Sequence, residues 1–328
     1  MRPEHEALLI LTRQKFPALA DVPCEVDPIL NGGSDRHFYR LRWPGNATPN
    51  MVLMVYTMAR QDNPKFVPAT QRLAAHGVRV PVIHAFDEDK LCVWLQDLGH
   101  DDLHGHRDNP WEVRKPLYEA TLTEGAKIHG ILEASLSKAD LALLEPPFDE
   151  ALYGWEQDYF LTHFVQGHLV RDYKAGRYTP AHEALKALRK RLAKEPRCLV
   201  HRDFQSQNVM LVNGEAWLVD YQGLRPGLAE YDLASLLFDP YVTLSAPERS
   251  QLLDYYAELR GLNGQELRQR FWLCAAQRLM QALGAYGNLS RNLGKPHFKQ
   301  HIPAAVANLT HVCEHDSSLH ELLPLFAL

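Results

Sequence analysis

The sequence predicts an α+β protein of two unequal lobes, a strand-rich lobe over residues 1–96 and a mainly helical lobe over residues 97–328. Short apolar runs between turn residues fill most of the first lobe, whereas helical spacing of apolar residues dominates after residue 99. A short strand pair is predicted inside the helical lobe, near residues 199–220. The length of 328 residues suits two domains or one fold with two lobes.

Turn-forming residues separate the strands expected in the first lobe. The strands are predicted at residues 26–30, 37–42, 51–57, 80–86 and 91–96. Turns at 31–35 and 87–90 connect the first two and the last two of these strands. One helix is expected in this lobe, over residues 63–76.

Helical periodicity marks most of the second lobe. The helices are predicted at residues 111–130, 149–173, 180–194, 246–261, 264–288 and 303–315. Within this lobe, residues 199–200 lead into a polar segment, and strands at 209–212 and 216–220 flank the turn Asn213-Gly214. A hinge between the lobes is expected near residues 96–99.

Composition excludes several classes of partner. A formal net charge of −5 argues against nucleic-acid binding, which requires a basic face. No apolar run approaches the roughly 18–20 residues that span a bilayer. The apolar stretch 7–11 is too short for a signal peptide, so a cytoplasmic protein is expected. Five dispersed cysteines without a CxxC pair indicate reduced thiols, and the oligomeric state stays open.

A polar segment between two predicted strands carries the strongest functional signal. It reads HRDFQSQN over residues 201–208, and the hairpin that follows ends at Asp220. This spacing resembles the catalytic loop of kinase-like phosphotransferases. In that chemistry Asp203 accepts or orients the proton of an attacking hydroxyl, while Asn208 and Asp220 offer the oxygen ligands that Mg²⁺ prefers. A second HRD triplet, at 106–108, lacks both the asparagine and the hairpin.

The turn between the first two predicted strands is a second candidate site. It contains Gly32, Gly33, Ser34, Asp35 and Arg36. Glycines let backbone N–H groups approach phosphates closely, so the turn is either a phosphate-binding loop or an ordinary hairpin turn. The sequence contains no GxxxxGK[ST] motif, which disfavours a P-loop enzyme.

Four stretches together resemble the aminoglycoside phosphotransferase family of kinase-fold small-molecule kinases. They are residues 31–41, 80–103, 199–211 and 218–241. Within that family the sequence is most similar to the bacterial cell-wall sugar kinases. These enzymes phosphorylate N-acetylmuramate and N-acetylglucosamine at the anomeric hydroxyl in peptidoglycan recycling.

The resemblance implies a two-lobed protein-kinase-like fold, ATP and Mg²⁺ as cofactors, and a small-molecule sugar as substrate. By the same resemblance, Asp203 is the catalytic base, and Asn208 and Asp220 bind Mg²⁺. The loop at 31–36 is expected to cover the ATP phosphates, and the backbone from Gln96 to Leu98 to contact the adenine.

The third predicted strand departs from the kinase pattern. Residues 51–57 contain no lysine, and the following segment, 61–66, contains no glutamate to pair with one. Loss of both partners avoids an unpaired buried charge. Because Asp203, Asn208 and Asp220 are all present, an active enzyme is expected rather than a non-catalytic nucleotide-binding module. Arg36, Arg40 and Lys65 are the alternatives for the missing cation.

The residues after Asp220 bear on the acceptor. Only about ten residues separate Asp220 from Asp232, too few for a peptide-docking segment, so a small acceptor is expected. An aminoglycoside would require carboxylates here, whereas Gln222 and Arg225 suit a neutral or anionic sugar. Arg225 is either a partner for the lactyl carboxylate of N-acetylmuramate or a surface arginine. Aminoglycoside, choline and homoserine kinases remain alternatives, and Asp232 is expected to cap a helix or brace the catalytic loop.

Overall fold

The computed structural model describes residues 3–29 and 36–327, so the candidate loop residues Gly32, Gly33, Ser34 and Asp35 lie outside the described residues. An antiparallel sheet of five strands forms the N-terminal region, in the order β1-β2-β3-β5-β4. The strands are β1 Glu25–Ile29, β2 His37–Arg42, β3 Met51–Val55, β4 Ile83–Asp87 and β5 Cys92–Gln96. Each corresponds to a predicted strand. The strand expected at 80–86 begins later than predicted, because Pro81 has no N–H to donate to a ladder.

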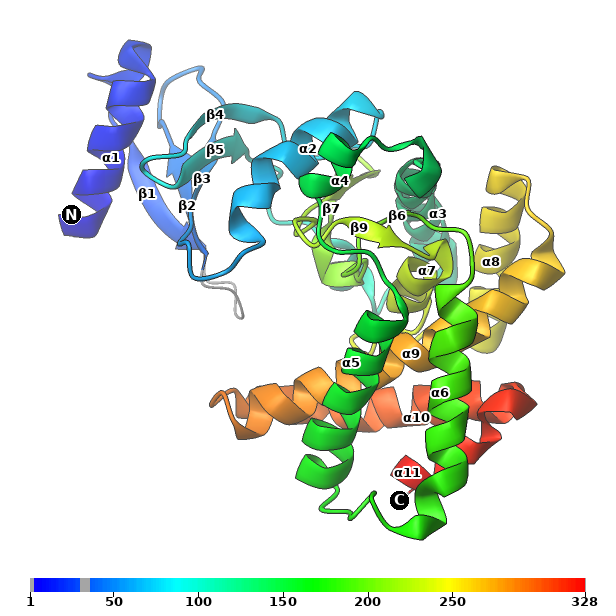
Figure 1. Cartoon of the computed structure of the whole chain (residues 1–328). Helices are drawn as coiled ribbons and strands as arrows, with labels where there is room; N and C mark the ends of the chain where they lie inside the picture. The colour runs from blue at the N-terminus through cyan, green and yellow to red at the C-terminus, as the bar shows by residue number, and fades with distance from the viewer. Residues whose placement is uncertain (1–2, 30–35, 328) are drawn as a thin grey trace.

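Helix α1 (Pro3–Lys15) covers one face of this sheet (Figure 1). Leu8 packs in an apolar cluster with Leu53 and Trp94, and Trp94 Nε1 donates a hydrogen bond to Thr12 Oγ1 at 3.0 Å. The expectation of a single helix in this lobe, at 63–76, is therefore wrong. Charged residues interrupt the apolar pattern of α1, and its helical state depends on packing against the sheet.

Helix α2 (Phe66–Ala75) follows a 3₁₀ turn, Asn63–Lys65, and accounts for the helix predicted at 63–76. Phe66 and Leu73 of α2 belong to the large apolar core, which also includes Met54 of β3. Because neighbouring strand residues point to opposite faces, Met54 and Leu53 place α2 and α1 on opposite sides of the sheet.

The C-terminal region is mainly helical and packs around the long helix α9 (Figure 1). Its helices are α3 Trp111–His129, α4 Lys138–Ala142, α5 Glu150–Phe160, α6 Thr179–Ala193, α7 Ala229–Leu237, α8 Ala246–Arg260, α9 Gly264–Arg291, α10 Ile302–His315 and α11 Leu323–Phe326. No helix among residues 3–29 and 36–327 combines the length and apolarity needed to cross a membrane. The five cysteines are free thiols, as predicted.

The helix predicted at 149–173 is shorter and changes character along its length. Helix α5 passes into a π-helical stretch, Leu161–His168, and the chain leaves the helix before Val170, whose φ is +55°. Helix α9 approaches α5 closely at Gly284. A Cβ atom added to Gly284 would lie 2.8 Å from Tyr159 Cδ1 and 3.0 Å from the backbone N of Phe160. The absence of a side chain on Gly284 therefore permits this helix pair.

Two short antiparallel strand pairs interrupt the helical region. Strand β6 (Cys198–Val200) pairs with β9 (Arg225–Gly227), and β7 (Val209–Val212) pairs with β8 (Glu215–Leu218). The sequence predicted the second pair but not β9. The β7–β8 hairpin is also bound to the segments that flank β4 and β5. Leu211 N donates to Asp101 O and Leu218 N donates to Arg79 O, both at 2.9 Å.

Candidate active site

The segment 201–208 connects β6 to β7 and brings the three predicted residues Asp203, Asn208 and Asp220 to one end of the hairpin. Asn208 Nδ2 donates to the carbonyl oxygen of Asp203 at 2.9 Å. Val219 N donates to Asn208 O at 3.0 Å, so Asn208 lies beside the residue that precedes Asp220. Polar residues that are separated in the sequence therefore lie close together in the fold.

Two buried carboxylates accept hydrogen bonds from this loop and fix its position. Asp232, on α7, accepts hydrogen bonds from His201 N at 2.6 Å and from Arg202 N at 2.8 Å. Asp239 accepts from both the backbone N (2.9 Å) and the Oγ (2.6 Å) of Ser206. Asp232 therefore braces the loop, one of its two predicted roles. Asp239 was not predicted, although a carboxylate after an apolar helix and before Pro240 is a usable signal.

Two residues of this site have a strained backbone. Arg202 has a φ of +77° and Asp220 a φ of +64°, in the left-handed region that non-glycine residues rarely adopt. Strained conformations of this kind persist where surrounding contacts determine them, and they cluster at functional sites. The hydrogen bond from Arg202 N to Asp232 supplies such a contact.

The carboxylate of Asp203 is 28% exposed and lies between two guanidinium groups. Arg202 Nη1 is 2.8 Å from Asp203 Oδ2, and Arg278 Nη2 is 3.8 Å from Oδ1. Burial alone would raise the pKa of Asp203, but Arg202 and then Arg278 outweigh it, so the pKa lies below its usual value. Asp203 is therefore ionised at neutral pH and able to accept a hydrogen bond from a hydroxyl.

Arg36 provides the cation nearest to the predicted metal ligands. Its Nη2 lies 2.6 Å from Asp220 Oδ1. The other two candidate cations pair elsewhere: Arg40 with Asp97, at 2.7 and 3.0 Å, and Lys65 with Glu145, at 2.6 Å. Arg36 thus joins the start of β2 to the end of the catalytic hairpin.

The donor set at the hairpin fits a magnesium ion. The Asn208 amide nitrogen donates to Asp203 O, which leaves its oxygen as a ligand, and the Asp220 carboxylate is already a partner for a cation. Hard oxygen donors of this kind suit Mg²⁺, which retains water and phosphate oxygens. Within the described part of the chain, no group of three or more His, Cys, Asp or Glu residues forms a further metal cluster.

The segment from Gln96 to Leu98 follows β5. Gln96 is engaged in the sheet, because its N donates to Val82 O at 2.8 Å. Leu98 is half-buried, and within residues 3–29 and 36–327 its backbone N and O form no hydrogen bond. A free donor and acceptor at this position could pair with the edge of a base.

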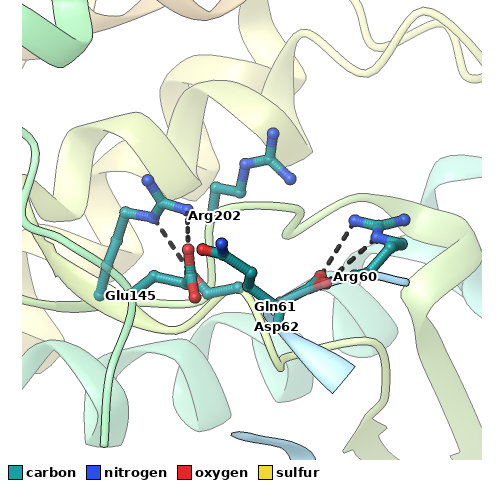
Figure 2. Close-up of a pocket in the computed structure, with 7 residues that line it drawn as sticks. Arg60, Gln61, Asp62, Glu145 and Arg202 are labelled. Carbon is teal, nitrogen blue, oxygen red and sulfur yellow. Dashed lines mark hydrogen bonds and ion pairs between the residues drawn. The ribbon is translucent and has the colours of Figure 1, made fainter. Parts of the chain in front are cut away.

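A polar cavity of about 280 Å³ lies beside Arg202 and Glu145 (Figure 2). It is lined by Arg60, Gln61, Asp62, Glu145, Arg202, Gly223 and Arg225. The side chain of Arg225 is 11% exposed, and its guanidinium lies 5.2 Å from the centre of the Phe148 ring. Arg225 is therefore not a surface arginine. Burial, and then the neighbouring Arg202, lower its pKa.

A β-sheet region joined to a helical region, with Asp203, Asn208 and Asp220 grouped where Arg36 connects the two, defines a kinase-like phosphotransferase. The chain belongs to the phosphotransferase enzyme family, whose model matches residues 25–270.

Sequence relatives cover nearly the whole chain. An N-acetylmuramate/N-acetylglucosamine kinase of Pseudomonas aeruginosa is 26% identical over 93% of this chain and 88% of its own length. A protein of the same name from Pseudomonas putida is 26% identical over 90% of this chain and 86% of its own length.

Solved structures share the fold at low identity. A choline kinase from Cryptosporidium parvum matches with a TM-score of 0.66 and 10% identity, over 98% of this chain and 99% of its own. The ADP-bound aminoglycoside phosphotransferase APH(2'')-Ib matches with a TM-score of 0.61 and 12% identity, over 95% and 99%. These similarities confirm the predicted two-lobed kinase-like α+β fold.

Proposed function

We propose that the protein transfers the γ-phosphoryl group of ATP to the anomeric hydroxyl of N-acetylmuramate or N-acetylglucosamine. The convergence of Asp203, Asn208 and Asp220 at one end of the hairpin carries the proposal of phosphoryl transfer. The choice of acceptor is supported by relatives of that name, which match 90% or more of the chain at 26% identity.

In this proposal each residue has a distinct task. Asp203 orients the acceptor hydroxyl and accepts its proton, because its carboxylate is ionised and partly exposed. Asn208 and Asp220 hold Mg²⁺, which supplies neutralisation of the negative charge on the ATP phosphates. Arg36 and the loop at 31–35 contact the phosphates.

The nucleotide is proposed to lie between the lobes. The backbone from Gln96 to Leu98 would face the adenine, which agrees with the unpaired N and O of Leu98 among the described residues. Residues 1–96 would then contribute most nucleotide contacts and residues 97–328 the catalytic and sugar contacts. A protein of this activity would act in the cytoplasm, where ATP is available.

The acceptor can be tested by measuring ADP release over a panel of compounds. The panel contains N-acetylmuramate, N-acetylglucosamine, an aminoglycoside, choline, homoserine and a peptide library. Turnover with the two amino sugars is expected. Turnover only with another acceptor would overturn the proposed substrate. Thermal stabilisation by Mg-ATP without turnover on any acceptor would instead indicate a nucleotide-binding module.

The assignment of Asp203 has its own test. Asp203→Asn is expected to lower kcat by about 10²–10⁴-fold, the usual effect of losing a general base. Asp254→Asn is the control, because Asp254 lies on the exposed face of α8 and pairs with Arg268. Turnover of Asp203→Asn close to that of the control would contradict the assigned role.

A further inference from the structure

The cavity beside Arg202 is bordered by three guanidinium groups from different parts of the chain. Arg60, from the segment between β3 and α2, and Arg202, from the catalytic loop, are labelled in Figure 2, and Arg225 belongs to β9. Arg202 spans from this cavity to Asp203, because its Nη1 donates to Asp203 Oδ2 at 2.8 Å. Only the Arg202 guanidinium would therefore separate a group bound in the cavity from the proposed catalytic base.

Positive charge exceeds negative charge around this cavity. Arg60 pairs with Asp62, with Nη2 and Oδ2 2.9 Å apart, and Arg202 pairs with Asp203. The remaining carboxylate, Glu145, is shared. Lys65 Nζ lies 2.6 Å from its Oε1, whereas Arg225 Nη2 lies 3.7 Å from its Oε2. Three arginines and two carboxylates, Asp62 and Glu145, line the cavity, so its lining carries a net positive charge.

Arg225 is the cation with the weakest compensation. Its Nε donates to Gly223 O at 3.1 Å, but within the described residues its two terminal nitrogens form no hydrogen bond. The side chain is nevertheless nine-tenths buried and held over the Phe148 ring. A guanidinium fixed in this way presents two parallel N–H donors, the arrangement that binds a carboxylate most strongly.

We propose that Arg225, together with Arg202 and Arg60, binds the carboxylate of an acidic acceptor sugar. This inference rests on the proposed function and identifies the part of the site that distinguishes between the two acceptor sugars. N-acetylmuramate carries a lactyl ether with a carboxylate, and N-acetylglucosamine carries a hydroxyl in its place. The cavity therefore contributes binding energy to the first sugar and little to the second.

Steady-state kinetics with both sugars test this inference. Arg225→Gln is expected to raise KM for N-acetylmuramate by roughly 10- to 100-fold, the effect of losing a hydrogen-bonded charge pair. The KM for N-acetylglucosamine is expected to change less than about threefold. Arg225→Lys, which keeps the charge but loses the paired donors, is expected to lie between the wild type and Arg225→Gln.

Two further variants keep the test decisive. Arg60→Gln removes a cation from the other wall of the cavity and is also expected to raise the KM for N-acetylmuramate. It therefore replaces Arg225→Gln in the test if Arg225→Gln does not fold. Arg268→Gln, on α9 and paired with Asp254, is the control and should leave both KM values unchanged.

The outcomes separate the two proposals. If the wild type phosphorylates both sugars and the cavity variants affect both equally, or neither, the carboxylate site is wrong and the sugar kinase stands. Wild-type activity restricted to N-acetylglucosamine would also overturn the carboxylate site. If neither sugar is phosphorylated, the proposed function fails and the carboxylate site fails with it.

Discussion

Replacing Asp232 by asparagine tests how far the catalytic geometry depends on a single buried side chain. The Asp232 carboxylate is inaccessible to solvent and accepts hydrogen bonds from His201 N and Arg202 N. An asparagine retains one oxygen and directs its NH₂ group at the other backbone donor, which is left without an acceptor. An unsatisfied buried donor costs about 1–3 kcal/mol, and the weaker remaining bond adds about 1 kcal/mol. We expect the free energy of unfolding to fall by roughly 2–4 kcal/mol.

Urea unfolding followed by circular dichroism measures this loss, and steady-state kinetics measure its effect on the site. Because Asp232 holds the segment that carries Asp203, kcat should fall while KM for ATP changes little. Asp254→Asn is the matched control, since its side chain is 64% exposed and its ion pair with Arg268 contributes about 1 kcal/mol or less. Equal unfolding midpoints and equal kcat for the two variants would refute the reasoning.

Two further substitutions test the packing and electrostatics of the helical region. Gly284→Ala places a Cβ atom 2.8 Å from Tyr159 Cδ1 and should lower the free energy of unfolding by about 1–3 kcal/mol. Gly176→Ala, whose Cβ meets nothing within 4 Å, should not lower it, and equal melting temperatures would contradict this account. Burial raises the pKa of Glu156 above its ordinary value of 4.5, so wild-type stability should fall as pH rises from 4.5 through that higher pKa. Glu156→Gln removes this titration, so urea unfolding across the same pH range should show a smaller decline in the free energy of unfolding. An unchanged decline in the variant would show that other titratable groups cause the pH dependence.

Local sequence patterns were sufficient to predict the elements whose structure depends mainly on neighbouring residues in the chain. The sheet strands and the β7–β8 hairpin were predicted, because alternating apolar residues and turn residues such as Asn213-Gly214 specify them directly. Helices α1, α4, α7 and α11 and strand β9 were missed. Strand β9 has only three residues and its partner β6 lies about 25 residues earlier, while α1 depends on contact with Trp94.

The candidate site was predictable to a similar degree. Asp203, Asn208 and Asp220 were identified from spacing within one loop and hairpin. The cation that replaces the missing strand lysine was left among three candidates, because only the tertiary fold brings one of them, Arg36, to Asp220 across 184 positions of sequence. Arg60 carried no motif, and Asp239 carried only the signal of a carboxylate between an apolar helix and Pro240, since their positions beside the catalytic loop arise from packing between distant segments.

The two hydrogen bonds from the β7–β8 hairpin to Arg79 O and Asp101 O bear on how the two lobes can move. They fasten the hairpin to the chain on both sides of the β4–β5 pair. The bond to Asp101 O lies on the helical side of residues 96–99, so a rotation of the sheet about these residues must either break the bond to Arg79 O or carry the hairpin with it. Movement of the sheet would then be coupled to movement of the hairpin, so the sheet and the proposed metal ligands Asn208 and Asp220 at the end of the hairpin would shift together.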